Sequence, residues 1–261
     1  MAEKKNELTF SQSLNNDLME VKDALPKDFN TARFVNNAVS LLNDNTVLQD
    51  FIRANGTTQV KAGMMKAAYL GLDFMSKEAH LVPFGKTLNF MVDYRGAEKL
   101  VKKYSIKPVS VITSFIVRDG DDFEVSIVDN EPKINFRPKP FNSGKVVGAC
   151  AYVTFTDGSI QYDTMSLEEL ENTRSHSKAK NSPAWTSFTN EMYRKTVLHR
   201  LCKHITLDFE SAEQLKTFNE DSEIETDPQE MAKADIEQNA NSVDFGEQET
   251  FVVDESGNVV E

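Results

Sequence analysis

The hydrophobic and polar positions of this chain follow a helical period over its first third. Apolar residues recur at helical spacing across residues 31–42, where Asn30 or Thr31 can cap a helix. Residues 59–70 repeat the pattern and end at Gly71, a residue typical of helix C-caps. The sequence therefore predicts that the chain begins with helices.

In the middle of the chain, the apolar positions follow the pattern of β-strands instead of helices. Two short apolar runs, 79–84 and 87–92, flank Gly85-Lys86 and predict a hairpin, and residues 94–104 predict one more short helix. Asp157-Gly158 is a strong hairpin turn, and Ser166 opens a capping box. The predicted strands after the short helix cover residues 108–117, 123–127, 133–136, 146–155 and 159–164.

The helical period returns in residues 182–205, which read as one long amphipathic helix. Its apolar positions run from Trp185 and Phe188 to Ile205. Its cations are Arg194, Lys195, Arg200 and Lys203. A basic helix within an acidic protein indicates a surface kept positive for an anionic ligand.

Charge is distributed unevenly along the 261 residues. The formal net charge is −12, yet residues 207–261 hold 17 acidic and 2 basic residues, a net of −15. The remaining 206 residues hold 27 basic and 24 acidic residues, a net of +3. A mildly basic body thus precedes an acidic tail, and the overall charge does not argue against a nucleic-acid ligand.

These patterns predict an α+β fold in which a mixed or antiparallel β-sheet packs with helices. Residues 1–50 are expected to be a helical region used for oligomerisation, because their apolar positions exceed what a small body can cover. Residues 51–218 are expected to form the α+β core. Residues 219–261 are expected to be a disordered acidic tail, whose terminal Phe251-Val-Val could dock a partner.

Two cysteines do not make a disulfide framework, so we expect a reducing, cytoplasmic compartment. The N-terminus has no apolar stretch typical of a signal peptide, and no segment approaches the roughly 18 apolar residues of a membrane span. No phosphate-binding glycine motif of a nucleotide hydrolase or dinucleotide enzyme is present.

Two metal sites can be considered. His199, Cys202 and His204 share one helix, but a spacing of five residues turns the two imidazoles to different faces. Asp121 or Asp122, followed by Glu131-Pro-Lys133, matches the acidic motif of metal-dependent nucleases, although Pro132 suits a central strand poorly. The alternative for these carboxylates is acidic residues that flank turns.

Basic residues interleave with aromatic ones in several places. Cations can contact phosphates while aromatic rings support stacked bases, a combination suited to single-stranded nucleic acid. Each cluster taken alone also fits a solvated face or a core aromatic, Trp185 in particular. The clusters contain Tyr94, Arg95, Lys99, Lys102, Lys103, Tyr104 and Lys107; Arg137 and Lys139 between Phe136 and Phe141; Lys178, Lys180 and Trp185; and Tyr193, Arg194 and Lys195.

Short sequence motifs add to this interpretation. An ordered set of short motifs between residues 25 and 206 resembles the RecT family of phage single-strand annealing recombinases. The motifs are Leu25-Pro-Lys, Arg33-Phe34, Ala67-Ala-Tyr-Leu-Gly-Leu72, Leu81-Val-Pro-Phe-Gly85, Tyr94-Arg-Gly96, Pro183-Ala-Trp185 and Glu191-Met-Tyr-Arg-Lys-Thr-Val-Leu-His-Arg-Leu-Cys-Lys203.

The resemblance implies an ATP-independent protein that binds single-stranded DNA, pairs it with a complementary strand and holds the annealed duplex. It implies rings or filaments on DNA, a core shared with the Rad52 annealing proteins, and a phage exonuclease or host single-strand-binding protein as partner. No cofactor is implied, with Mg²⁺ as a candidate modulator. The family positions that match are Tyr94, Arg95, Trp185, Arg194, Lys195, Arg200 and Lys203; His199 departs from a common basic residue.

Overall fold

Helices and antiparallel strands make up the first of two units, residues 1–225 and 226–261. The computed structural model describes residues 9–129, 131–177 and 180–220, and the backbone of 252–253 and 259–260. The helices of the first unit are α1 (Phe10–Glu20), the 3₁₀ turn η1 (Lys22–Ala24), α2 (Thr31–Asp44), α3 (Thr46–Asn55), α4 (Thr58–Leu70), α5 (Tyr94–Tyr104), α6 (Leu167–His176), α7 (Pro183–Ser187), α8 (Thr189–His204) and α9 (Ala212–Asn219).

All strand pairs among the described residues are antiparallel, which confirms the predicted α+β class. The second unit contributes one short pair, β8 (Val252–Val253) with β9 (Val259–Val260). The strands of the first unit are β1 (Ala79–Phe84), β2 (Thr87–Val92), β3 (Val109–Arg118), β4 (Asp122–Val128), β5 (Glu131–Arg137), β6 (Val146–Phe155) and β7 (Ile160–Ser166).

Local signals in the sequence set several of these boundaries. The Asn30 side chain accepts a hydrogen bond from the Arg33 amide at 2.9 Å and so caps α2. Gly71 ends α4 with φ 66°, a left-handed conformation that glycine adopts without steric cost. The predicted capping box at Ser166 is also present, as both of its hydrogen bonds to Glu169 form. These predictions are confirmed.

Most apolar positions of the N-terminal helices are covered at least in part by the chain itself. Leu14 and Leu18 of α1, Ala38 of α2 and Leu48 of α3 are almost fully buried and belong to the same hydrophobic core as α5 and α8. Much of the apolar surplus of residues 1–50 is therefore covered within one chain, whereas Met19 and Val47 are 56% and 60% exposed, and the predicted oligomer contact stays a prediction. The proposed boundary at residue 50 stays a prediction.

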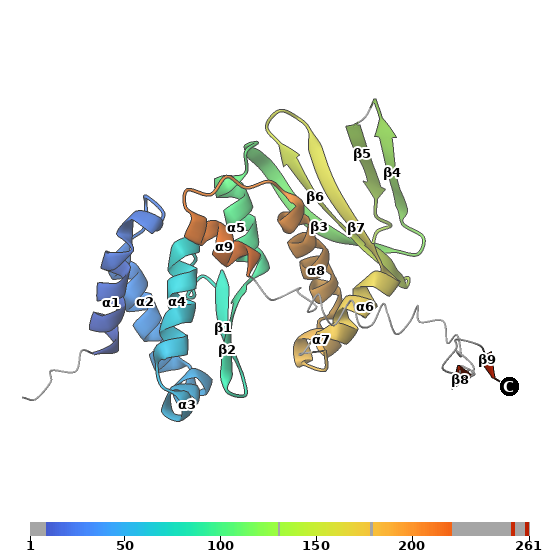
Figure 1. The fold of residues 1–261 in the computed structure, drawn as a ribbon. Helices are drawn as coiled ribbons and strands as arrows, with labels where there is room; N and C mark the ends of the chain where they lie inside the picture. Colours follow the sequence, from blue (N-terminus) through green and yellow to red (C-terminus); the bar gives the residue numbers. More distant parts are fainter. Residues whose placement is uncertain (1–8, 130, 178–179, 221–251, 254–258, 261) are drawn as a thin grey trace, which may run out of the picture. The chain divides into compact units, whose positions relative to one another are not determined.

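A three-stranded sheet in the order β3-β6-β7 carries α8 on one face (Figure 1). Alternate residues of the strands, including Ile112, Ala149 and Val153, turn inward into the core that contains Val197 and Leu201 of α8. β1 and β2 form a separate hairpin beside α4 and α5, and β4 and β5 form another (Figure 1). The sheet thus holds α8, the basic helix predicted from the sequence, in place.

The predicted single helix over 182–205 is wrong in one respect, because the chain bends at Phe188 between α7 and α8. In a continuous helix, residues 185 and 193 lie about 12 Å apart along the axis. The bend lets the rings of Trp185 and Tyr193 lie 6.2 Å apart in the core. Phe188, predicted to be on the apolar face, is instead exposed to solvent.

The ordered body extends to α9, where Gln214 and Phe218 are buried and the helix packs against α4. The predicted disordered tail lies mostly outside the described residues. Among the described residues, no helix is both long enough and apolar enough to cross a membrane.

Candidate nucleic-acid interface

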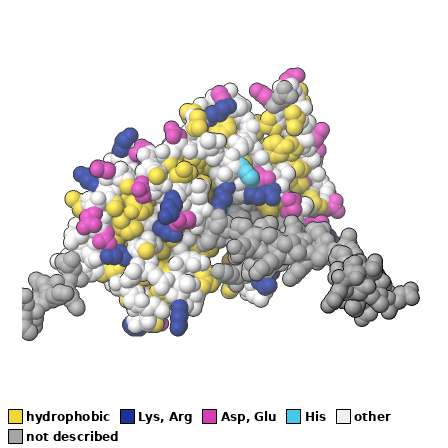
Figure 2. Space-filling model, viewed as in Figure 1, with side chains coloured by type: hydrophobic (Ala, Val, Ile, Leu, Met, Phe, Trp, Pro, Cys, Tyr) yellow, Lys and Arg dark blue, Asp and Glu magenta, His cyan; other side chains and the backbone are white. Residues whose placement is uncertain are grey.

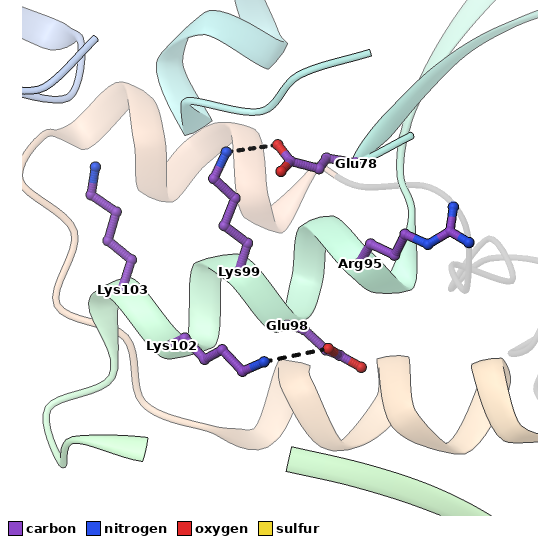
Figure 3. A pocket seen from close by; sticks show the side chains of 6 residues that line it. All are labelled: Glu78, Arg95, Glu98, Lys99, Lys102 and Lys103. Atoms are coloured by element: carbon purple, nitrogen blue, oxygen red, sulfur yellow. Dashed lines mark hydrogen bonds and ion pairs between the residues drawn. The ribbon is translucent and has the colours of Figure 1, made fainter. Parts of the chain in front are cut away.

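Helix α5 presents a row of cations to one open pocket. Asp93 caps the helix, and Ala97, Leu100 and Val101 anchor it in the core, which leaves its polar positions on the surface. The pocket has a volume of about 410 Å³ and is lined by Glu78, Arg95, Glu98, Lys99, Lys102 and Lys103 (Figure 3). Four cations against two carboxylates make this pocket a net-positive surface.

Most of these cations already have an acidic partner. Lys99 donates to Glu78 at 2.7 Å and to the Gly71 carbonyl oxygen at 2.8 Å (Figure 3). Lys102 lies 3.7 Å from Glu98, whose pKa is raised by burial. Lys103 pairs with Asp28, and this hydrogen bond lowers the pKa of Asp28.

Arg95 differs from its neighbours on α5. It is exposed, its guanidinium lies 5.3 Å from the ring centroid of Tyr94, and it forms no ion pair among the residues that the structure describes. A guanidinium over an aromatic ring can still donate hydrogen bonds at its edge. Arg95 is therefore the cation of this pocket that is best prepared to bind a phosphate.

Asp93 joins three elements at the start of α5. Its carboxylate accepts hydrogen bonds from the Arg95 amide at 3.2 Å, and lies 3.2 Å from Lys195 Nζ of α8 and 3.5 Å from His80 Nε2 of β1. Burial by itself raises the pKa of Asp93, but the hydrogen bond from His80 and the charge of Lys195 outweigh it and lower the pKa to about 2. The carboxylate is thus ionised and holds Lys195 beside α5.

The two arginines predicted on α8 are used to attach the helix to the sheet. Arg200 makes a two-point pair with Asp163 of β7, at 2.6 and 2.7 Å, and this bonding raises its pKa. Arg194 donates to the carbonyl oxygen of Ser114 on β3 at 3.1 Å and lies 3.3 Å from Glu191. Both edges of the Arg200 guanidinium are thus occupied within the chain, and the DNA contact predicted for it stays a prediction.

Trp185 lies in the core, only 5% exposed. The guanidinium of Arg174 lies 5.8 Å from its ring centroid, and Tyr193 packs against it. Tyr193 in turn donates a hydrogen bond to Glu171. This burial fits the alternative of a core aromatic, and the DNA contact predicted for Trp185 stays a prediction.

The remaining predicted cations belong to segments other than α5. Lys107 follows α5 and pairs with Asp157 at 3.0 Å in the turn between β6 and β7. Arg137 ends β5 and Lys139 follows it, and both are exposed. Lys203 is half-buried near the end of α8. Figure 2 shows Lys and Arg side chains in separate groups with acidic side chains among them.

The nuclease alternative does not fit the hairpin. The register of β4 with β5 places Glu131 opposite Val128, six residues or about 20 Å along the strand from Asp122. Asp121 accepts hydrogen bonds from two backbone amides and an asparagine side chain, and so holds the loop together. Within the described ranges, no group of three His, Cys, Asp or Glu side chains could hold a metal ion.

The acidic partners that arrange the cations, above all Asp93 and Asp163, were not predicted from the sequence. Asp93 could have been found as a helix cap, because it directly precedes the helical pattern at Tyr94. Asp163 carries no such signal, since it is one polar position in an alternating strand. Glu78 precedes β1 and reaches Lys99 only through the tertiary structure.

The sequence of this chain matches a known protein family and one named relative. The family model described as "RecT family" matches residues 32–235. The chain is 28% identical over 164 residues to a protein named Protein RecT from Escherichia coli strain K12, an alignment that covers 59% of this chain and 60% of that protein. The match therefore spans less than two thirds of the relative. Because the family model covers most of the chain, the chain belongs to the RecT family.

Proposed function

We propose that this protein binds single-stranded DNA and anneals it to a complementary strand during homologous recombination, without hydrolysing a nucleotide. The observation that carries the proposal is the basic pocket on α5, with Arg95 exposed at its edge. Its cations come from one helix whose opposite face is anchored in the core, so they are held at a constant spacing. Membership of the RecT family supports the same function.

Annealing requires no bond to be made or broken in the protein or the DNA backbone. Two strands must be held extended while the repulsion between their phosphates is screened, and lysine and arginine side chains supply this screening. Recognition through phosphates is independent of base sequence, as an annealing protein needs. We therefore propose a DNA-binding protein rather than an enzyme, with no required cofactor and with Mg²⁺ as a modulator.

The ion pairs on α5 add to this proposal. Lys102 is exposed and lies 3.7 Å from the half-buried Glu98, and so long a pair with one exposed member contributes little, at about 1 kcal/mol or less. A DNA phosphate can therefore displace Glu98 at low cost. In contrast, the buried pair of Lys195 with Asp93 is costly to break. We propose that Arg95 and Lys102 contact DNA, and that Lys195 supports them.

We further propose that several copies of the chain act together on one DNA strand, as a ring or filament, in the cytoplasm of a bacterial host. A phage exonuclease that generates single strands and the host single-strand-binding protein are the proposed partners. The physical argument is one of length, because a 410 Å³ pocket contacts only a few nucleotides.

One assay tests the proposed function directly. Purified protein is mixed with complementary fluorescent oligonucleotides without ATP, with and without Mg²⁺, and duplex formation and strand length are followed. We expect faster annealing than in the absence of protein, and intact strands. Mg²⁺-dependent shortening of the strands would support the nuclease alternative. If the protein neither speeds annealing nor shortens the strands, both functions are refuted.

A further inference from the structure

The hairpin of β4 and β5 has one entirely apolar face. Residues alternate strictly along both strands, and the register pairs Phe123 with Phe136 and Val125 with Ile134. The six residues of this face are Phe123, Val125, Ile127, Pro132, Ile134 and Phe136. Such a pattern is typical of a sheet with one buried face.

Five of the six residues of this face are half-buried, and the open end packs on β3. The ring of Phe136 stacks on that of Phe115 of β3, with centroids 4.0 Å apart, and Phe123 packs edge-on against both. At the turn end, Ile127 is 70% exposed. None of the six residues belongs to the hydrophobic core or to the partly buried residues packed against it. Figure 2 shows hydrophobic side chains gathered over this hairpin.

DNA is a poor occupant for the apolar face. No cation lies on it, and the other positions of the hairpin carry four carboxylates against two cations. The acidic residues are Asp122, Glu124, Asp129 and Glu131, and the basic ones are Lys133 and Arg137. A phosphate backbone would be repelled here. The same charge disfavours the acidic tail of the chain as occupant.

A second copy of the chain is a suitable occupant, because it offers an apolar strand edge to the apolar face of the hairpin. Among the described strands, β4 and β5 pair only with each other, and β3 is at the edge of the order β3-β6-β7. Val111 of β3 lies on the same face as Phe115 and is 46% exposed. Each copy therefore offers an apolar hairpin and an apolar sheet edge, and such edges pair readily between chains.

We propose that the apolar face of the β4–β5 hairpin is a self-association surface, which packs against the β3 edge of a second copy of this chain. The inference rests on the proposed function in one respect, namely that several copies act on one strand. A hairpin of one copy that meets the sheet of the next is a head-to-tail contact, which can be repeated along a DNA strand.

Two adjacent residues test the proposal with a matched control. Ile127 and Val128 are both exposed at the turn end of β4, but they lie on opposite faces of the hairpin. We expect Ile127→Asp to weaken self-association of the full chain about tenfold or more, as truncation of an interface anchor does. Val128→Asp should assemble like the unchanged protein. Sedimentation velocity over a concentration series, with and without long single-stranded DNA, measures both.

A labelling experiment reports contact at the same positions. The native thiols, Cys150 and Cys202, are buried, and burial raises the pKa of each to about 12, so they react slowly. Ile127→Cys and Val128→Cys therefore each introduce one reactive thiol. With an environment-sensitive dye attached, the probe at 127 should change its emission on assembly, and the probe at 128 should change much less.

The outcomes separate the proposal from its rivals. Equal assembly of Ile127→Asp and the unchanged protein, or equal weakening by both aspartates, would overturn it. A loss of affinity for an oligonucleotide short enough to bind one copy, with assembly intact, would assign the face to DNA bases instead. If assembly depends on Ile127 but the unchanged protein fails to anneal strands, the surface stands and the proposed function fails.

Discussion

At the scale of single residues, Asp93 is the group with the clearest pH dependence. Its pKa is lowered from 3.8 to about 2, so its charged form stabilises the fold by about 2 kcal/mol. This contribution is complete above about pH 5 and is lost as the pH falls through 4 toward 2. We expect Asp93→Asn, which keeps an oxygen to cap α5, to lose it at pH 7. Urea unfolding should show the two proteins converging near pH 2, whereas a constant difference would contradict this account.

Arg95 is the residue for which a direct DNA contact is most testable. Arg95→Ala should weaken binding to single strands of any sequence and reduce the slope of log affinity against log salt by about 0.7, the value for one lost phosphate contact on a single strand. Fluorescence anisotropy at several salt concentrations measures this slope. Arg53→Ala is the control, because Arg53 on α3 is also exposed and pairs with Asp50. An unchanged slope in Arg95→Ala would remove Arg95 from the interface.

At the scale of elements, α8 depends on Arg200 for its attachment to β7. The guanidinium is largely buried and also donates to the Thr164 carbonyl oxygen at 2.8 Å. Arg200→Ala leaves Asp163 without its partner, so we expect a loss of about 1–3 kcal/mol in the free energy of unfolding. Thermal and denaturant unfolding measure the loss. If the folded variant instead keeps its stability and has a smaller salt slope, Arg200 contacts DNA.

At the scale of the whole molecule, the uneven charge has its own consequence. Residues 222–261 hold 12 acidic and one basic residue, so they oppose the binding of phosphates at low salt. A chain that ends at residue 221 should bind single-stranded DNA more tightly at about 50 mM salt, and the difference should shrink at higher salt as charges are screened. Annealing by the pure truncated protein should persist. Loss of annealing would make the acidic segment part of the annealing surface.

Much of the fold was determined by local sequence. Asn30, Gly71 and Ser166 set helix boundaries through hydrogen bonds or backbone conformations that reach only a few residues. The same is true of the Asp157-Gly158 turn, where Gly158 has φ 85°. Alternation also revealed most strands. The basic composition of α5 and the family resemblance predicted a surface for DNA, because both are properties of the residues themselves.

Only the tertiary structure decided how the cations are used. Sequence cannot distinguish Arg95 from Arg200, since both are arginines on helices in motifs of one family. Their roles diverge because Asp163 lies opposite Arg200 on a strand 37 residues away, whereas Arg95 meets no acidic partner within the described residues. The burial of Trp185 likewise follows from a bend that no local signal marks. The sequence determines the charges and the periodicity of apolar positions. Which charges remain available to a ligand depends on contacts between distant segments.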